Sequence, residues 1–418
     1  MPKLPAPAPL DLAFVRAQFP DACWGDGWAF FENAGGAYVP NSVIARITAY
    51  MTECQVQPDA RFPKSRLATE RIKAGHAAMA AMIGAAPEEV TVGPSTSMNV
   101  YILAQALRPL WREGDEVVVA TLNHEANSSP WRRLATSGIK VIDWPAQPVT
   151  GGLRVDLLPQ LLTDRTRLVA FPHVSNITGD INDVAAITQT VHDAGAMVCA
   201  DGVSYAPHRA VDVKAWDVDF YVFSFYKVFG PHLGLLYGKR DRLLEARGQY
   251  HDFFPEDDLG HKLAVAGPNH ESIAALQGIA DYIEALAAHH GVEGNSLQAR
   301  TQGVFKLIAA HEETLAARFL DFATSRPDLR LIGRPSPKAA DRAPTFSFTV
   351  EGRRSADIVH AVETDKIALR HGDFYAPRLL KAVGIADPDD GVIRASMAHY
   401  NTVEEVERLI WALDRFGC

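Results

Sequence analysis

Cysteine is scarce in this sequence, with four residues among 418. Cys23, Cys54, Cys199 and Cys418 show neither a CxxC pair nor the Cys/His spacing of a metal site. Such isolated cysteines are typical of reduced thiols in the cytosol. We therefore expect a cytoplasmic protein with no bound metal.

Long apolar runs are missing as well. Residues 1–20 contain prolines where a signal peptide needs an apolar run, and no later stretch is long and apolar enough to span a bilayer. The sequence also lacks an excess of positive charge, since its formal net charge is -9. These absences argue against a membrane or a nucleic acid as the main partner.

The pattern that is present indicates an α/β protein. At 418 residues the chain is expected to form two domains of unequal size. From about residue 70, β-branched runs alternate with helix-period segments, which predicts a largely parallel, doubly wound sheet. The strands are nearly continuous apolar runs, so both faces of the sheet should be covered. The expected strands are 89–93, 115–122, 139–144, 167–174, 196–203, 219–226 and 233–238.

The pattern changes after about residue 290. A long helical stretch leads to apolar segments at 344–352, 367–375 and 391–401, and the last helix opens with a Thr402/Glu405 capping box. We expect an N-terminal segment (1–25), a large domain (26–290) and a small α+β domain (291–418). The segment 250–272 is polar and punctuated by Gly and Pro, which predicts a long functional loop.

Lys227 has an unusual setting for a lysine, among Tyr226, Val228 and Phe229. Desolvation disfavours the ammonium form, so a lysine in apolar surroundings can lose its proton and attack a carbonyl. Position alone favours an ordinary surface lysine at a strand end. The catalytic interpretation is favoured because Asp201 ends an apolar strand upstream and a Ser/Thr loop opens an earlier helix.

Other expected strands also end in side chains that can act chemically. Ligands bind beyond the carboxyl ends of strands in open α/β sheets, so these side chains should converge on one rim. Met and aromatic residues such as Trp131 and Phe223 are expected in the core. The converging residues are His124, Asn176, Asp201, Ser224 and Lys227, with Ser95, Thr96 and Ser97 at a helix start.

Together these groups suit pyridoxal phosphate. That cofactor needs a lysine for its Schiff base and a carboxylate against its pyridinium nitrogen, which Lys227 and Asp201 would supply. Its phosphate needs hydroxyls and amides at a helix N-terminus, which residues 95–97 would supply. His124 could stack on the ring and Asn176 could hydrogen-bond its 3′-oxygen. Alternatively, His124 is an ordinary loop residue, Asn176 caps a turn and residues 95–97 only cap a helix.

The sequence resembles the class V aminotransferases, particularly the cysteine desulfurase-like group of fold-type I pyridoxal-phosphate enzymes. The resemblance covers nearly the whole chain. It implies a mostly parallel seven-stranded sheet in a large domain, a small C-terminal α+β domain and a homodimer with active sites at the interface. The motifs that carry it are FFENAGGAYVP, NHEANSSPW, HVSNITG, the segment 200–234 and IRASMAHYNTVEEVERL.

The resemblance also implies roles for individual residues. Lys227 matches the Schiff-base lysine, Asp201 the partner of the pyridine nitrogen and His124 the stacking residue. Arg394 matches the arginine that pairs with the substrate α-carboxylate, although a structural ion pair is the alternative. The remaining matches are Asn176 at the 3′-oxygen, Ser95, Thr96 and Ser224 at the phosphate, and Asn33, Ala34, Gly35 and Arg370 on the substrate side.

Four positions depart from the family pattern. Ser204 stands where relatives commonly carry glutamine, and Tyr226 where many carry histidine, so the cofactor contacts of both are expected to be redistributed. His270 stands where a threonine usually reaches the phosphate of the partner subunit. Tyr375 stands where desulfurases carry the persulfide-forming cysteine, so we do not expect persulfide chemistry in that loop.

We therefore expect a pyridoxal-phosphate enzyme that acts on the amino group or the β-substituent of a small amino acid, by transamination or β-elimination. Three alternatives stay open: a cysteine desulfurase using Cys54 or Cys199, an amino-acid epimerase and a non-catalytic sensor. Such sensors normally carry a DNA-binding module, for which residues 1–20 leave no room. The side chain of the substrate would be recognised by residues 30–38, 61–66, 250–272 and 370–378.

Overall fold

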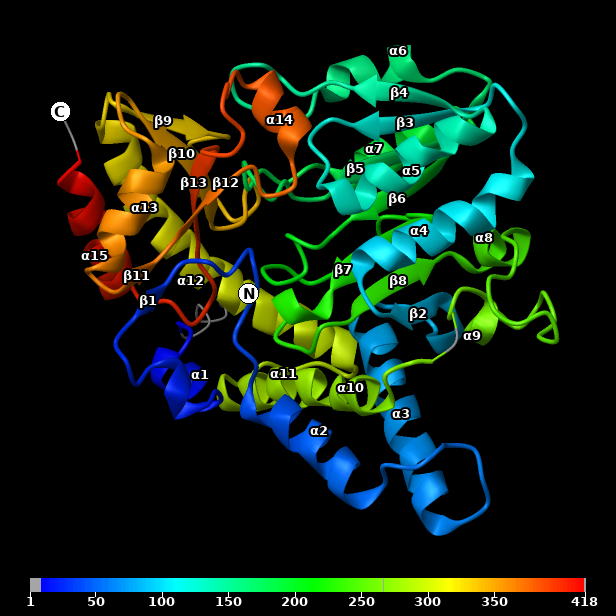
Figure 1. Ribbon diagram of the computed structural model, residues 1–418. Helices are drawn as coiled ribbons and strands as arrows, with labels where there is room; N and C mark the ends of the chain where they lie inside the picture. Colours follow the sequence, from blue (N-terminus) through cyan, green and yellow to red (C-terminus); the bar gives the residue numbers. More distant parts are fainter. Residues whose placement is uncertain (1–8, 266, 417–418) are drawn as a thin grey trace, which may run out of the picture.

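The computed structural model describes residues 9–265 and 267–416, so Cys418 lies outside the described residues. It contains a seven-stranded sheet and a four-stranded sheet, which lie apart in the molecule with helix α12 (Leu297–Ser325) running between them (Figure 1). The first half of α12 packs in the core of the larger sheet and its second half in the core of the smaller one. This helix therefore joins the two cores.

The larger sheet has the strand order β2-β8-β7-β6-β5-β3-β4. Neighbours from β7 to β4 pair in parallel, whereas β8 is antiparallel to both β7 and β2. The prediction of a mostly parallel seven-stranded sheet is confirmed. The strands are β2 (Val90–Gly93), β3 (Glu116–Ala120), β4 (Lys140–Trp144), β5 (Thr166–Pro172), β6 (Met197–Asp201), β7 (Phe220–Ser224) and β8 (Gly234–Gly238).

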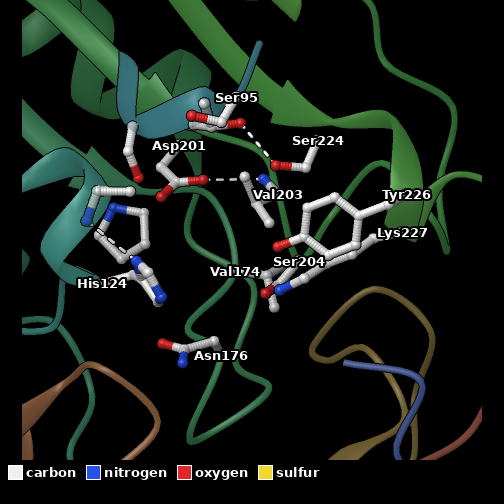
Figure 2. Close-up of a pocket in the computed structure, with 14 residues that line it drawn as sticks. Ser95, His124, Val174, Asn176, Asp201, Val203, Ser204, Ser224, Tyr226 and Lys227 are labelled. Atoms are coloured by element: carbon white, nitrogen blue, oxygen red, sulfur yellow. Dashed lines mark hydrogen bonds between the residues drawn. The ribbon is translucent and has the colours of Figure 1, made fainter. Parts of the chain in front are cut away.

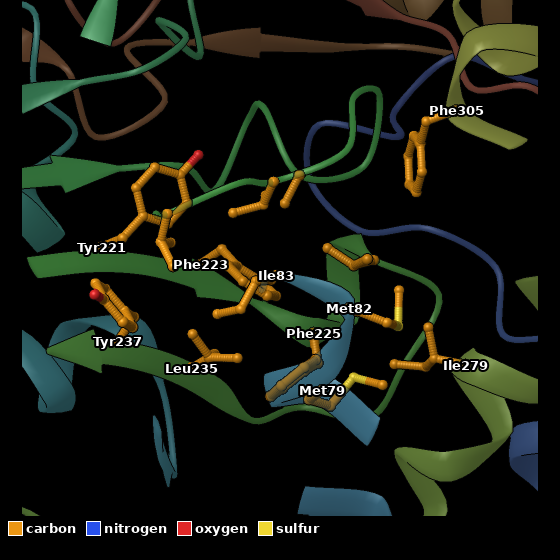
Figure 3. Packing of buried hydrophobic residues seen from close by; sticks show 14 of the residues in the cluster. Met79, Met82, Ile83, Tyr221, Phe223, Phe225, Leu235, Tyr237, Ile279 and Phe305 are labelled. Carbon is orange, nitrogen blue, oxygen red and sulfur yellow. The ribbon is translucent and has the colours of Figure 1, made fainter. Parts of the chain in front are cut away.

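Both faces of this sheet are buried, as the apolar strands predicted. Along β3, Val118 and Ala120 point into one hydrophobic cluster and Val117 and Val119 into the other. Figure 3 shows the first cluster, in which Tyr221, Phe223, Leu235 and Tyr237 lie near Ile83. Trp131 is fully buried in the second cluster. The sheet is thus a rigid platform whose strand ends are held in place from both sides.

The helices that precede α12 in the chain cover this sheet or lie at the end of the molecule that contains α1, α2 and α3 (Figure 1). They are α1 (Leu12–Ala17), α2 (Asn41–Glu53), α3 (Pro63–Met82), α4 (Thr96–Leu107), α5 (Ser129–Arg133), α6 (Leu158–Leu161), α7 (Val184–Asp193), α8 (Arg240–Glu245), α9 (Leu259–Lys262), α10 (His270–Ala275) and α11 (Gln277–His289). Single 3-10 turns are η1 (Asp21–Cys23), η2 (Pro87–Glu89), η3 (Arg108–Leu110), η4 (Glu125–Asn127), η5 (Leu134–Ser137), η6 (Val155–Leu157) and η7 (Phe225–Lys227).

The segment predicted as one long loop, 250–272, is interrupted. Helix α9 forms within it because Asp258 caps the backbone N–H of His261, and α10 begins at His270 behind the N-cap Asn269. Among the described residues, no helix has the length and apolar character that crossing a bilayer would require.

The smaller sheet is antiparallel, with the order β12-β13-β10-β9. The segment 367–375 contains two short strands, because β11 pairs with β1 near the chain start while β12 pairs with β13. The predicted Thr402/Glu405 capping box is present. The elements are β1 (Ala29–Phe30), β9 (Leu329–Ile332), β10 (Thr345–Val350), α13 (Ser355–Glu363), β11 (Ile367–Ala368), β12 (Arg370–Gly372), α14 (Pro377–Ala382), β13 (Val392–Ser396) and α15 (Val403–Asp414).

The start of the chain contributes to the smaller core. Ala29 and Phe31 are fully buried in the cluster that contains Phe319, Phe346 and Phe348. The turn that follows, residues 32–36, is thereby held beside β13, where Glu32 bridges to Ser396. The N-terminal turn therefore lies near the carboxyl ends of the strands of the large sheet.

Candidate active site

A cavity lies at the carboxyl ends of β5, β6 and β7, which we call the inner chamber (Figure 2). The structure brings together in it nine of the ten residues predicted to contact a cofactor, the exception being His270. The chamber is lined by Ser95, Thr96, Ser97, His124, Ala126, Pro172, Val174, Asn176, Asp201, Val203, Ser204, Ser224, Tyr226 and Lys227.

Lys227 ends η7, the turn that follows β7, and is only 7% exposed. Burial, together with the charge of Arg394, lowers the pKa of Lys227 to about 8. Its Nζ atom has no hydrogen-bond partner within the described part of the chain. Lys262 is a useful contrast, because it is equally buried but its Nζ donates to the carbonyl oxygens of Leu244 and Glu256 at 3.1 and 2.5 Å. Lys227 is therefore a buried amine that is left available for reaction.

Asp201 is the last residue of β6 and is 4% exposed. Its Oδ1 accepts a hydrogen bond from the backbone N–H of Val203 at 2.9 Å, whereas no described residue donates to Oδ2. Burial raises the pKa of Asp201 to about 6. A cationic N–H in the chamber would pair with the free oxygen and favour the ionised carboxylate.

The N-terminus of α4 opens at the other end of the chamber. Ser95 caps this helix, with its Oγ accepting from the N–H of Met98 at 3.2 Å, and Thr96 and Ser224 share a hydrogen bond of 2.7 Å between their hydroxyls. A Cβ at Gly234 would lie 2.4 Å from the backbone nitrogen of Thr96, so glycine is needed for α4 to lie this close to β8. Free N–H groups, hydroxyls and the helix dipole make this end a site for an anion.

His124 follows β3 and reaches the chamber from the side. Its Nδ1 accepts from the N–H of Ala126 at 3.0 Å, so the proton of the neutral ring is on Nε2. Burial, with the charges of Lys227 and Arg394, lowers the pKa of His124 to about 3. The residue is therefore a neutral flat ring. Asn176 lies opposite and donates from Nδ2 to the carbonyl oxygen of Phe374 at 2.9 Å.

These groups fit pyridoxal phosphate. The donors at the start of α4 suit its phosphate, the unpaired Oδ2 of Asp201 suits its ring nitrogen and the unpaired Nζ of Lys227 suits its aldehyde carbon. Ser204 and Tyr226 also line the chamber, and the redistribution of their cofactor contacts stays a prediction.

A second cavity adjoins the first, and we call it the outer chamber. It shares His124, Asn176, Tyr226 and Lys227 with the inner chamber. Predicted substrate residues Ala34, Gly35, Arg370 and Arg394 all line it. Its full lining is Ala34, Gly35, His124, Asn176, Tyr226, Lys227, Arg370, His371, Gly372, Asp373, Phe374, Tyr375 and Arg394.

Arg394 lies on β13 at the inner wall of this outer chamber. Its Nη2 donates to Oε1 of Glu32 at 3.0 Å and its Nη1 to the carbonyl oxygen of Asn176 at 3.3 Å. The guanidinium carbon lies 3.8 Å from the ring centroid of Phe374. Burial lowers the pKa of Arg394 to about 10, so the side chain stays cationic at neutral pH.

Asn33 and His270 are not brought to either chamber. The Asn33 amide donates to the carbonyl oxygen of Ser396 at 2.8 Å and its oxygen accepts from the Tyr400 hydroxyl, so its polar atoms are used to hold the N-terminal turn. His270 lines a separate cavity with His76 and Tyr250. Contact of His270 with the partner subunit's phosphate stays a prediction.

The loop of residues 371–376 closes one side of the outer chamber. Phe374 and Tyr375 both have positive φ, 49° and 59°, which is rare for aromatic residues. The carbonyl oxygen of Tyr375 accepts from the N–H of Glu125 at 2.9 Å, and the Tyr375 ring lies 5.2 Å from that of His124. The backbone, rather than the 67% exposed Tyr375 side chain, therefore ties the loop to the large sheet.

Three contributors to the site were not singled out from the sequence, although Glu32 and Phe374 lie within the ranges 30–38 and 370–378 that were expected to recognise the substrate. The N–H of Val203 and the ring of Phe374 act through backbone and packing geometry, which leave no sequence signal. Glu32 could have been found, because it directly precedes the Asn33–Gly35 turn that was predicted to face the substrate.

Comparison with known proteins adds evidence from outside the chain. The profile of the family described as aminotransferase class V matches residues 29–409. The aminotransferase-like protein FGM3 of Gibberella zeae is 38% identical over 96% of this chain and 97% of its own length. The cysteine desulfurase-like protein ustD of Aspergillus flavus is 34% identical over 97% and 90%. The crystal structure of the cysteine desulfurase CsdA from Escherichia coli superposes with a TM-score of 0.80 at 28% identity, over 97% of this chain and 98% of that one.

Proposed function

Since this chain belongs to the class V aminotransferase family, whose members are pyridoxal-phosphate enzymes, we propose that it acts on the amino group or the β-substituent of a small amino acid. The observation that carries the proposal is the pairing of Lys227, buried and without a hydrogen-bond partner, with the free oxygen of Asp201 in one chamber. Neither feature serves packing.

Bound pyridoxal phosphate supplies an electron-accepting ring that stabilises negative charge at the substrate Cα. Asp201 would hold a proton on the ring nitrogen, because its Oδ2 is free and little solvent reaches it. Thr96, Ser224 and the N-terminus of α4 would hold the phosphate.

Lys227 would take the proton from Cα as a general base once it is released from the cofactor. Its lowered pKa of about 8 leaves an appreciable neutral fraction near physiological pH. Arg394 would hold the α-carboxylate, and the neutral ring of His124 would cover one face of the cofactor. Return of the proton to the cofactor would give transamination, return to Cα would give epimerisation, and departure of a β-substituent would give elimination.

The observations on thiols disfavour a cysteine desulfurase mechanism through Cys54 or Cys199. Both side chains are fully buried in hydrophobic clusters, and burial raises the pKa of Cys199 well above its ordinary value. A persulfide needs an accessible thiolate next to the substrate, and neither residue lines either chamber. We therefore propose chemistry at Cα that does not use a protein thiol.

We further propose a cytoplasmic homodimer in which 26–290 forms the large domain and 291–418 the small one. Two observations support the dimer. His270 lines a cavity away from its own chain's chambers, and Ile44, Met51 and Phe62 of the N-terminal helical region are exposed. Sedimentation of the holoenzyme would measure the oligomeric state.

A panel of small amino acids tests the function. Purified holoenzyme is mixed with each amino acid, and the cofactor absorbance, keto acid, ammonia and enantiomeric composition are followed. Transamination predicts conversion of the cofactor to its pyridoxamine form, and β-elimination predicts pyruvate and ammonia. A cofactor spectrum that changes when an amino acid binds but is never followed by turnover would contradict an enzymatic function and favour the sensor.

A further inference from the structure

Two arginines of the outer chamber share one carboxylate. Arg370 on β12 and Arg394 on β13 are directly opposite in the antiparallel register. Oε1 of Glu32 lies 3.0 Å from Nη2 of Arg394 and 3.6 Å from Nη1 of Arg370. The side chains of Arg394 and Glu32 are 4% and 10% exposed, whereas that of Arg370 is 64% exposed. The carboxylate therefore lies between a buried cation and a solvent-facing one.

Arg394 has one edge left for a substrate, and Glu32 occupies half of it. Nη1 is directed to the carbonyl oxygen of Asn176, and the face packs on Phe374. Nε is buried and has no hydrogen-bond partner. Nε and Nη2 form the edge on which a guanidinium binds a carboxylate through two parallel hydrogen bonds. A substrate carboxylate that takes both Nε and Nη2 in this way competes with the Glu32 carboxylate at Nη2.

Glu32 is held loosely enough to leave. It makes a single hydrogen bond to Arg394, and no described residue donates a hydrogen bond to its Oε2. A Cβ on Gly35 would lie 2.0 Å from Oε2, so the carboxylate occupies space that only glycine leaves open. Gly35 thus makes room for the Glu32 carboxylate over the N-terminal turn.

We propose that Glu32 occupies Arg394 until an amino acid arrives, and that Arg370 receives it when the substrate α-carboxylate takes the Nε/Nη2 edge. This inference rests on the proposed function, because it needs an amino-acid substrate. Arg370 matters since a buried carboxylate without a partner cation is costly, and its exposed side chain is free to follow Glu32. Glu32 and Arg370 are then positioning residues that set the affinity for ligands with an α-carboxylate.

The dissociation constants of two ligands test the exchange. L-Alanine carries the α-carboxylate and ethylamine lacks it, and binding is measured for each from the initial change in cofactor absorbance of the holoenzyme. Glu32→Gln removes the competing charge, so L-alanine should bind about fivefold more tightly. Arg370→Gln removes the receiving cation, so L-alanine should bind about threefold more weakly. The dissociation constant of ethylamine should change by less than about twofold in both variants, because ethylamine leaves Glu32 in place.

The double variant Glu32→Gln/Arg370→Gln distinguishes two roles of Arg370: receiving the Glu32 carboxylate, or contacting the substrate directly. If Arg370 acts through Glu32, Arg370→Gln should have no effect on L-alanine binding in the Glu32→Gln background. A full effect there would show that Arg370 contacts the substrate itself and would overturn the exchange. Weaker L-alanine binding by Glu32→Gln would also overturn it, because Glu32 would then be a fixed support of Arg394.

The outcomes also distinguish the exchange from the proposed function. Arg370 is exposed, so Arg370→Gln should fold even if a substitution at Glu32 does not, and unchanged L-alanine binding by it contradicts the exchange. A wild-type holoenzyme that responds to neither ligand contradicts the proposed function and this inference with it. A response to both ligands with unaltered constants in both variants contradicts the exchange alone.

Discussion

The inner and outer chambers share four residues but are built in different ways. The inner chamber is formed by the ends of parallel strands and one helix N-terminus, and its key groups, Lys227 Nζ and Asp201 Oδ2, have no partner in the described chain. The outer chamber is formed by the N-terminal turn, β12, β13 and the loop of residues 371–376, and its main cation, Arg394, is already paired.

This difference separates chemistry from selection. A buried group without a partner has its pKa shifted and is poised to react, as Lys227 and Asp201 are. Arg394 is already paired with Glu32 through Nη2, and we propose that it binds a ligand by exchange. The inner chamber therefore suits the cofactor of a pyridoxal-phosphate enzyme, and we propose that the outer chamber governs which amino acid is accepted.

The largest effect is expected from the inner chamber at Lys227. Lys227→Ala removes both the covalent attachment of the cofactor and the general base, so turnover of any amino acid should fall by at least about 10³-fold. The matched control is Lys262→Met, which removes the other buried lysine of the described residues and should leave kcat/KM within about threefold. Retention of more than a tenth of the activity in Lys227→Ala would contradict the assignment of the chemistry to the inner chamber.

The outer chamber is expected to act on binding. Arg394→Gln should raise KM for an amino acid by about 30-fold, since a hydrogen-bonded charge pair contributes about 2 kcal/mol. The value of kcat should fall less, because Lys227 is the proposed general base. Steady-state kinetics of Lys227→Ala and Arg394→Gln would show whether the first lowers mainly kcat and the second raises mainly KM. An equal loss of kcat and kcat/KM in Arg394→Gln would assign Arg394 to the chemical step instead.

The phosphate end of the inner chamber is expected to act on cofactor affinity. Ser224→Ala removes the hydroxyl that bonds Thr96 and should weaken cofactor binding about fivefold, the value of one hydrogen bond of about 1 kcal/mol. Dialysis followed by titration with cofactor measures the constant. Ser325→Ala, on the last turn of α12, serves as a control for loss of a hydroxyl outside both chambers.

The pH dependence of cofactor capture reports on Lys227 directly. With a pKa of about 8, roughly a tenth of the amine is neutral at pH 7 and nine tenths at pH 9. The rate of covalent capture by cofactor-free protein should therefore rise roughly tenfold over this range and then level off. Arg394→Gln should move the rise to higher pH, because the charge of Arg394 helps to lower the Lys227 pKa. A rate that still climbs at pH 10 would contradict the shift.

The smallest effect is expected at Tyr375. Its ring is mostly exposed and the loop is held through its backbone oxygen, so Tyr375→Phe should change kcat/KM by less than about threefold. A loss of tenfold or more would show that the hydroxyl takes part in the reaction and would draw this loop into the chemistry of the inner chamber.

The inner chamber could be predicted from the sequence because each residue follows a strand or opens a helix. Asp201, Ser224 and Lys227 come at the ends of apolar runs, and parallel strands bring such ends to one edge. The outer chamber depends on contacts between distant segments. Glu32 pairs with Arg394, which lies 362 positions later in the sequence, and no local sequence pattern predicts that pairing.

The same contrast explains what the sequence could not show. Asn33 was grouped with Ala34 and Gly35 as a substrate residue, but its amide is turned to Ser396 and Tyr400, and a sequence carries no record of that orientation. The segment 367–375 forms two short strands because its first residues pair with β1, a partner more than 300 residues earlier in the chain.

The most direct measurement is borohydride reduction of the holoenzyme followed by peptide mapping. The account predicts that the cofactor is fixed to the ε-nitrogen of Lys227 and that Lys262, buried but bonded to two carbonyl oxygens, stays unlabelled. Label on another lysine, or on none, would contradict the central claim.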